Sequence, residues 1–182
     1  MAESGVKGFE SGKKKGRCWD LILRTTALAF TLTAAVLLGV NKQTKLITAQ
    51  PFPTLPPMTV PLTAKWHYLS AFIFFVVANS IASGYAAISL IPSFLAKKRP
   101  SMAVIVLDLL MVGLLFSSIG AAGAIGIIGQ KGNDHVKWNK VCNVFDKFCH
   151  QVIAAIALSF IGSLAFFLLV VLAAHNLHKK SH

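Results

Sequence analysis

Four long runs of apolar residues constrain this chain more than any other feature. They span residues 21–40, 66–90, 101–128 and 151–174, and each reaches the roughly 20 residues that a helix needs to cross a bilayer. Only 13% of the 182 residues are charged, about half the fraction of a typical soluble domain. Lipid offers no hydrogen-bond partner to an open backbone. We therefore expect an all-α membrane protein with a four-helix transmembrane bundle.

The positions of Lys and Arg predict how the bundle is oriented. Basic residues are concentrated in residues 1–18, in the link "AKKRPS" after the second run, and in residues 177–182. These three segments share one side of a chain that crosses the membrane four times. Both termini are therefore expected to be cytosolic, with residues 1–18 as a disordered basic tail, residues 19–176 as the membrane domain and residues 177–182 as a short tail.

The net charge of +12 follows from these basic flanks, which contact anionic lipid headgroups. Lipids are thus expected partners, and nucleic acid is not. Cys18 lies at the boundary of the first run, as either a plain interfacial cysteine or a palmitoylated one. No Asn-x-Ser/Thr sequon occurs in the chain, so N-glycosylation is not expected.

The two remaining segments are expected to lie outside. The first contains "AQPFPTLPPMTVPLTAKW", whose five prolines exclude a regular helix and favour extended backbone, as a docking surface or a stiff linker. The second contains Cys142 and Cys149, and an oxidising compartment favours a disulfide between them. A continuous helix would hold them about 10 Å apart, beyond the ~7 Å limit of a disulfide, so pairing requires the chain to turn back. The rival is a metal site with His135 and His150, although the spacing matches no common zinc pattern.

Four blocks of sequence resemble a known family. They are "LILRTTALAFTLTAAVL", "FFVVANSIASGYAAISL", "VLDLLMVGLLFSSIGAAGAIGIIGQKGN" and "WNKVCNVFDKFCHQ". Together they are similar to the CASP-like family of plants, relatives of the Casparian strip membrane domain proteins and more distantly of the MARVEL proteins. The last three blocks resemble its first subgroup. The resemblance covers about residues 17–180. It implies a plasma-membrane protein with four spans and cytosolic termini that forms homo- and hetero-oligomers with itself and its relatives.

The Casparian strip proteins build an immobile scaffold that recruits wall-modifying proteins. Their characteristic short motif in the first outer segment is not found in this sequence, which has the Pro-rich stretch there. The resemblance therefore implies a membrane scaffold, with extracellular wall-modifying proteins as possible partners, rather than strip formation itself.

Two charged residues lie inside the apolar runs. Asp108 is the only acid there and Arg24 the only base, at depths of about 10 and 6 Å from the cytosolic side at 1.5 Å per residue. A charge at a helix centre costs about 2.5–3.5 kcal/mol on insertion scales and normally faces a partner. We predict an ion pair that joins the first helix to the third. A protonated or water-facing Asp108 is the alternative, and an Arg24 considered alone could extend to the headgroups.

Small residues form a stripe on the third run, on the side of the helix opposite Asp108. They are Gly113, Ser117, Gly120, Ala121 and Ala124. Such a stripe lets helices approach closely in lipid, with the fourth helix as the first candidate partner and a second protomer as the other.

The sequence contains no nucleotide loop, catalytic triad or paired carboxylates, and we expect neither an enzyme nor a bound cofactor or metal. A scaffold is the favoured interpretation. The alternative is a small channel or transporter that uses the Asp108/Arg24 pair, with Asn79 and Ser83 as further polar groups. Such proteins usually have more polar stations or broken helices.

Overall fold

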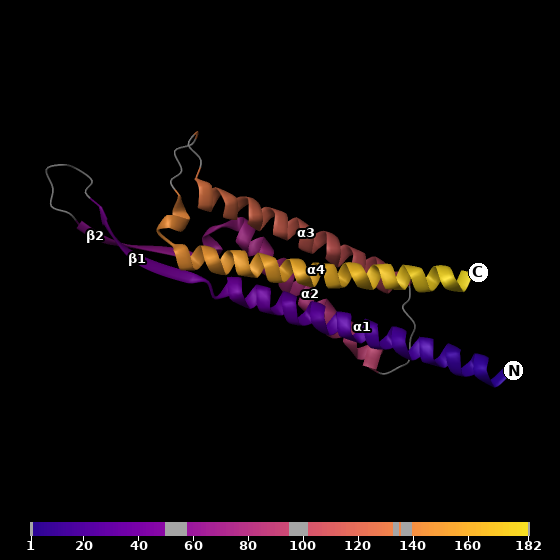
Figure 1. Ribbon diagram of the computed structural model, residues 1–182. Helices are drawn as coiled ribbons and strands as arrows, with labels where there is room; N and C mark the ends of the chain where they lie inside the picture. Colours follow the sequence, from indigo (N-terminus) through magenta and orange to yellow (C-terminus); the bar gives the residue numbers. More distant parts are fainter. Residues whose placement is uncertain (1, 50–57, 95–101, 133–134, 136–139, 182) are drawn as a thin grey trace.

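Four long helices lie side by side in the computed structural model, which describes residues 2–49, 58–94, 102–132, 135 and 140–181. They are α1 (Ala2–Gly39), α2 (Ser70–Phe94), α3 (Met102–Lys131) and α4 (Asp146–Ser181). Each is long and apolar enough to cross a membrane. Both termini lie at one end of the bundle, and a β-hairpin projects from the other (Figure 1). The predicted four-helix membrane architecture is confirmed, and we call the two ends the terminal end and the hairpin end.

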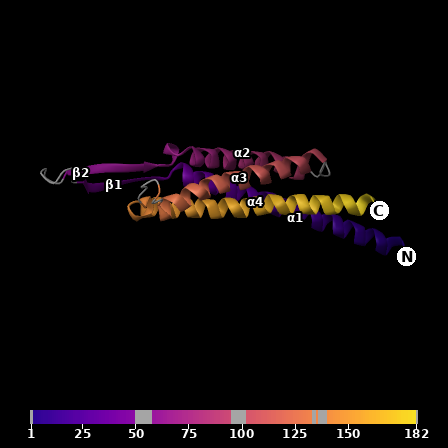
Figure 2. The ribbon, with the colours of Figure 1, turned by 90° about the horizontal axis from the view of Figure 1, so that it is seen from above.

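The helices form a ring in which each packs on two neighbours. Helix α1 packs on α2 and α4, and α3 packs on the same two helices. The pairs α1–α3 and α2–α4 therefore face each other across the centre of the bundle. Seen from above, the long axes of α2 and α4 run nearly parallel, and that of α3 is tilted between them (Figure 2). Helices consecutive in the chain are neighbours, and α4 closes the ring on α1, as in other up-and-down helix bundles.

Several helix boundaries differ from the sequence-based expectation. Helix α1 begins at Ala2, so most of the tail that we expected to be disordered continues the first spanning helix. Residues 2–20 contain no proline, and extending an existing helix adds a hydrogen bond per residue without a new nucleation step. Helix α2 begins at Ser70 rather than 66, because Trp66–Tyr68 forms a 3-10 turn, η1. Helix α4 begins at Asp146 rather than 151 and runs on to Ser181.

The end of α3 has a clear local cause. Gly132 adopts φ 73°, the left-handed conformation that glycine accepts without steric cost. Its N–H donates to the carbonyl oxygen of Ile128 at 2.8 Å, which satisfies one of the free carbonyls at the helix C-terminus. The third helix therefore ends at Lys131, beyond the expected end at 128, and stops at a glycine.

The first segment at the hairpin end is a two-stranded antiparallel sheet. Strand β1 (Lys42–Ala49) pairs with β2 (Met58–Lys65), with Lys42 opposite Lys65 and Leu46 opposite Pro61. A proline is tolerated because β2 is an edge strand. Extended backbone at Pro61 agrees with the sequence-based expectation, but the strand pairing was not predicted. Pro51, Pro53, Pro56 and Pro57 lie outside the described residues.

The interior of the bundle is made of two apolar clusters with polar side chains between them. The cluster toward the terminal end contains Leu23, Ala27, Ala82, Ala86, Val112, Leu115, Ala165, Phe166 and Leu169. The cluster toward the hairpin end contains Ala34, Leu38, Phe72, Phe75, Ala122, Phe145, Phe148, Val152 and Ala155. Many members are alanines, which lets the helices come close together without a large side chain between them.

Helices α1 and α4 lie close together at Gly162. A Cβ atom added there would lie 2.8 Å from Thr31 Cγ2 and 3.5 Å from the Thr31 backbone nitrogen. Thr31 is fully buried, and its hydroxyl donates to the Ala27 carbonyl of its own helix at 2.8 Å. A hydroxyl satisfied in this way can lie in an apolar interface. The contact therefore requires glycine on α4.

We predict that Gly162→Ala destabilises the bundle by about 1–3 kcal/mol, the usual cost of overpacking a close interface. Gly123→Ala is the matched control, because a Cβ at Gly123 meets no atom within 4 Å. The measurement is the apparent Tm of the detergent-solubilised protein, followed by size-exclusion chromatography after heating. Equal Tm values for the two variants would contradict the close α1–α4 approach.

Candidate functional site

Arg24 on α1 and Asp108 on α3 form a bidentate ion pair inside the bundle. The distance from Arg24 Nη2 to Asp108 Oδ2 is 3.2 Å, and from Nη1 to Oδ1 it is 3.3 Å. Only 4% of the Arg24 side chain and 1% of the Asp108 side chain are exposed. The structure thus brings together the two residues that the sequence analysis paired. The two helices face each other across the ring, and the long arginine side chain covers that distance.

Helix α2 contributes two further groups, so the pair belongs to a network of three helices. The Tyr85 hydroxyl lies 2.7 Å from Asp108 Oδ1, and Arg24 Nη1 donates to Ser89 Oγ at 2.9 Å. Within α1, Arg24 Nε lies 3.3 Å from both carboxylate oxygens of Asp20. The guanidinium therefore has acceptors on several sides, and the Asp108 carboxylate has a donor on each oxygen.

Sequence reasoning missed Tyr85, Ser89 and Asp20. Asp20 was detectable, because it precedes Arg24 by four residues and such pairs share a helix face. Tyr85 and Ser89 have the same four-residue spacing on α2, which indicates a common face. Nothing in the sequence indicates that this face turns toward Asp108.

A second polar contact crosses the other diagonal of the ring. The Ser159 hydroxyl on α4 donates to Asn79 Oδ1 on α2 at 2.8 Å, and both residues are fully buried. Asn79 Nδ2 donates to the Phe75 carbonyl of its own helix. A polar group in the membrane interior is costly without a partner. Asn79, suggested by the sequence as a further polar station, is thus bound to α4. Ser83 donates to the Ser80 carbonyl within α2.

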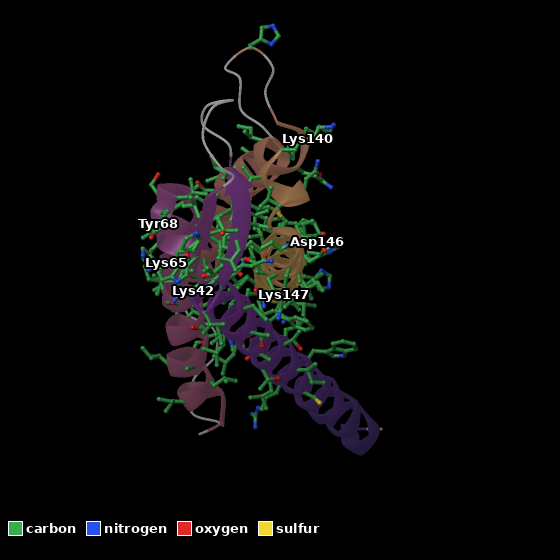
Figure 3. The ribbon with its side chains drawn as sticks, turned by 90° about the vertical axis from the view of Figure 1, so that its left-hand side faces the viewer. Lys42, Lys65, Tyr68, Lys140, Asp146 and Lys147 are labelled. Atoms are coloured by element: carbon green, nitrogen blue, oxygen red, sulfur yellow. A yellow bond between two sulfur atoms is a disulfide. The ribbon has the colours of Figure 1, made fainter. Side chains whose placement is uncertain are left out.

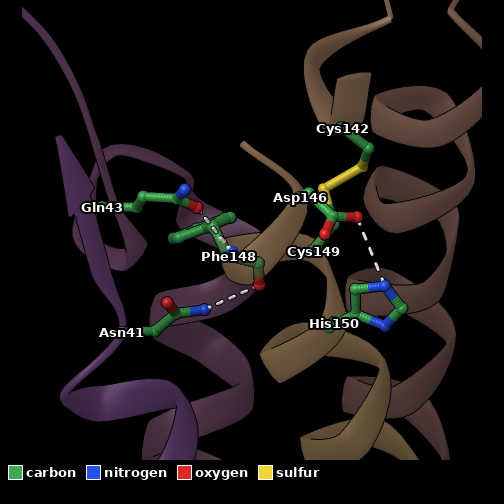
Figure 4. Close-up of a disulfide and its surroundings, with 7 residues drawn as sticks. All are labelled: Asn41, Gln43, Cys142, Asp146, Phe148, Cys149 and His150. Carbon is green, nitrogen blue, oxygen red and sulfur yellow. Dashed lines mark hydrogen bonds and ion pairs between the residues drawn. A yellow bond between two sulfur atoms is a disulfide. The ribbon is translucent and has the colours of Figure 1, made fainter. Parts of the chain in front are cut away.

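At the hairpin end, Cys142 and Cys149 form a disulfide with Cα atoms 5.7 Å apart. The segment between them is no continuous helix, because Val141–Asn143 forms a 3-10 turn, η3, before α4 begins at Asp146. The chain thus makes the turn that the sequence analysis required. Figure 4 shows the bond beside the exposed Asp146–His150 pair, whose Oδ1–Nε2 distance is 3.3 Å.

The same part of α4 is attached to the hairpin. The Phe148 backbone N–H donates to Gln43 Oε1 at 2.8 Å, and Asn41 Nδ2 donates to the Phe148 carbonyl oxygen at 3.0 Å (Figure 4). Two side chains of the α1–β1 segment therefore hold the backbone N–H and C=O of one residue of α4. Together with the disulfide, these bonds fix the base of the hairpin against the start of α4.

The small residues of α3 face away from the bundle. Gly113, Ser117, Gly120 and Ala124 are exposed and Ala121 is half-buried, while the buried residues of α3 are Asp108, Val112, Leu115, Ser118 and Ala122. A Cβ at Gly113 or Gly120 would meet no atom within 4 Å. The stripe therefore does not form the contact with α4 that was its first candidate. The reason is that Asp108 turns the opposite face of α3 inward.

No group of three or more metal-ligating side chains occurs among the described residues. His135 is exposed, and His150 contacts Asp146. Because Cys142 and Cys149 bind each other, their thiolates are not available as ligands. In the part of the chain that the structure describes, the buried polar side chains make hydrogen bonds within and between helices, and Arg24 is ion-paired with Asp108 and Asp20.

Comparison with known proteins agrees with this architecture. Residues 13–165 match the Casparian strip membrane protein domain. The chain is 62% identical to CASP-like protein 1E2 of Vitis vinifera, over 96% of this chain and 90% of the relative. It is 60% identical to CASP-like protein 1E1 of Ricinus communis, over 99% and 94% of the two chains. It is 51% identical to CASP-like protein 1E1 of Arabidopsis thaliana, over 96% and 92%. No solved structure gives a significant match.

We predict that Arg24→Leu and Asp108→Leu each destabilise the bundle, and that the double variant is more stable than the worse single variant. Removing one partner of a buried pair typically costs about 3–5 kcal/mol, because a buried charge is left behind. Arg24→Leu is expected to be the more destabilising of the two single variants. In Arg24→Leu the Asp108 carboxylate keeps one donor, the Tyr85 hydroxyl, whereas in Asp108→Leu the Arg24 guanidinium keeps two acceptors, Asp20 and Ser89. Apparent Tm in detergent and surface biotinylation measure the effect.

The two tyrosines of the chain supply the control. Tyr85→Phe removes one hydrogen bond to the carboxylate and should cost about 1.5–3 kcal/mol. Tyr68→Phe removes the same atom from a residue that is 62% exposed and should leave Tm unchanged. A double Leu variant no better than the worse single, together with a neutral Tyr85→Phe, would mean that the network does not hold the helices together.

Proposed function

The chain belongs to the family of the Casparian strip membrane protein domain, and we propose that it is a multi-pass scaffold of the plasma membrane. In this function it associates with copies of itself and with related family members, and it organises a patch of membrane. The proposed partners are these chains, the surrounding lipids and wall-modifying proteins outside the cell. The proposal includes no catalytic activity.

The observation that carries the proposal is the outward face of α3. Helices in lipid gain no hydrophobic driving force from meeting each other, so small residues that allow close backbone approach dominate their contacts. Gly113, Ser117, Gly120 and Ala124 present such a surface on a helix whose other face is committed to the bundle. Of the four spanning helices, α3 is the least buried: 17% of its most apolar stretch is buried, against 33–39% in the other three. A second protomer is the partner that suits this face.

The buried charges support a structural role rather than transport. A transport acid needs a vacant coordination position or a second polar station. The Asp108 carboxylate instead accepts from Arg24 and Tyr85 and lies at 1% exposure. The hollow lined by Asn41, Lys42, Lys65, Trp66 and His67 lies at the hairpin end, away from this network. A bundle whose buried charges are paired internally suits a scaffold.

The proposed orientation places the terminal end in the cytosol and the hairpin end outside. The disulfide between Cys142 and Cys149 supports this side as the oxidising one. The basic residues of the "AKKRPS" link and of both termini support the cytosolic side for the other end.

We predict that a membrane-impermeant maleimide labels the hairpin end in intact cells and the terminal end only after permeabilisation. The two reporters are Lys45→Cys and Arg17→Cys, each placed at an exposed position in a Cys18→Ser background. Labelling of Arg17→Cys in intact cells would reverse the proposed orientation. Equal labelling of both under the two conditions would show a mixed topology.

We predict that Gly113→Leu combined with Ser117→Leu reduces association between two differently tagged copies by at least about fivefold, since two leucines block close approach of the helices. Co-precipitation from detergent and energy transfer between labelled copies in liposomes are the measurements. Surface expression should be unchanged, because neither residue is buried.

The control replaces the same residue types at the same spacing on α2, as Ser80→Leu with Gly84→Leu. Both positions are exposed, and a Cβ at Gly84 meets no atom within 4 Å. Equal loss in both variants would assign the effect to general crowding of the lipid-facing surface. Unchanged association in the α3 variant would remove the stripe as the interface.

A further inference from the structure

The hairpin end is strongly basic. Its segments, residues 41–69 and 131–150, contain seven lysines against two aspartates. The lysines are Lys42, Lys45, Lys65, Lys131, Lys137, Lys140 and Lys147. Lysines on the outer side oppose the charge bias that orients a membrane protein. The orientation of the chain in the membrane therefore does not account for these lysines, whereas an anionic partner outside the membrane accounts for them.

Two of these lysines face each other at the base of the hairpin. Lys42 is directly opposite Lys65 in the antiparallel register, and like charges in that arrangement destabilise a strand pair. Neither has an ion-pair partner among the described residues. Both line a hollow of about 240 Å³ together with Asn41, Trp66 and His67. An anion in this hollow removes the repulsion that the bare hairpin carries.

Aromatic rings lie beside these lysines. Lys65 Nζ is 5.7 Å from the centre of the Tyr68 ring, and Trp66 lines the hollow. Tyr and Trp side chains combine an apolar ring face with one polar group, and the C–H groups of a sugar ring pack well against such a face. Basic groups next to aromatic faces thus suit a ligand that carries both carboxylates and sugar rings.

The charges are distributed over the whole end of the bundle. Figure 3 shows Lys42, Lys65 and Tyr68 on one side of the hairpin, and Lys140, Asp146 and Lys147 on the other side. Lys45 is three residues farther along β1 than Lys42, about 10 Å farther out at the rise of a strand. Lys45 therefore lies farther from the bilayer than the ends of the spanning helices, which are at the level of the lipid headgroups. A long polyanion can contact these separated charges at once, and each added contact multiplies the affinity.

We propose that the hairpin end binds an acidic polysaccharide through its uronate carboxylates, with Lys42 and Lys65 as the central counter-charges. The inference rests on the outer location of this end in the proposed function. It does not depend on self-association. The polymer would anchor the extracellular side of the scaffold to the material outside the membrane.

The test uses the full chain, purified in an uncharged maltoside detergent, and polygalacturonate immobilised on a biosensor. The fully methyl-esterified polymer is the ligand control, since it keeps the sugar backbone and loses the charge. We expect binding to the acid form that weakens with salt and at least tenfold weaker binding to the ester. Lys42→Gln with Lys65→Gln should weaken binding about ten- to thirtyfold, since each lysine beside an anionic surface contributes about 1 kcal/mol.

The matched protein control removes the same charge from the terminal end, as Lys13→Gln with Lys14→Gln, and should bind like the parent. A second outer pair, Lys140→Gln with Lys147→Gln, should give an intermediate loss and guards against a folding defect of the first. Equal binding to the acid and ester polymers would overturn the proposal. An equal loss of binding in the Lys13/Lys14 variant and the Lys42/Lys65 variant would overturn it as well. Binding to anionic vesicles but not to polygalacturonate would assign the lysines to lipid phosphates instead. Loss of self-association with polymer binding intact would leave this inference standing and contradict only the proposed scaffold assembly.

Discussion

The buried ion pair across the centre of the bundle is the contact on which the rest of the structure depends. In lipid, apolar helices gain little by meeting each other, whereas an unpaired charge in the hydrocarbon is costly. Arg24 and Asp108 lie on helices that face each other across the ring, and Tyr85 and Ser89 join from a third. The pair therefore fixes which faces of α1, α2 and α3 point inward. The Asn79–Ser159 contact does the same for α2 and α4.

The inward direction of Asp108 also determines what α3 presents to the lipid. Because the buried residues of α3 follow the Asp108 face, the small residues on the opposite side are exposed. One charged residue thus gives the helix two distinct surfaces, one for its own bundle and one free for another chain. A scaffold that assembles in the membrane plane needs both, since the bundle must keep its shape while a neighbour packs against it.

The hairpin end is stabilised by different interactions from the bundle, because it lies beyond the helices that cross the membrane. A two-stranded sheet alone is marginally stable in water. Here its base is held by Asn41 and Gln43, which bind the backbone of Phe148 on α4, and the adjacent turn is closed by a disulfide. Lys42, Lys45 and Lys65 are thereby presented on a fixed support rather than on a loose loop. This is the arrangement that binding to an extended anionic polymer requires.

The sequence by itself determined the number of spanning helices and the membrane environment, because long apolar runs leave lipid-facing helices as the one solution. The family was indicated by four blocks of sequence. The sequence also identified Arg24 and Asp108, since isolated charges in such runs demand a partner, and it stated that Cys142 and Cys149 could pair only if the chain turned back. It did not determine where helices begin, as the helical tail from Ala2 and the shift of α2 to Ser70 show. Only the tertiary structure decided that Tyr85 and Ser89 complete the network and that the small stripe faces outward. The reason is that helix rotation and neighbour order depend on contacts between segments far apart in the chain, and hydrophobicity is nearly uniform around these helices. The pairing of β1 with β2 was decided in the same way, by partners that local sequence does not specify.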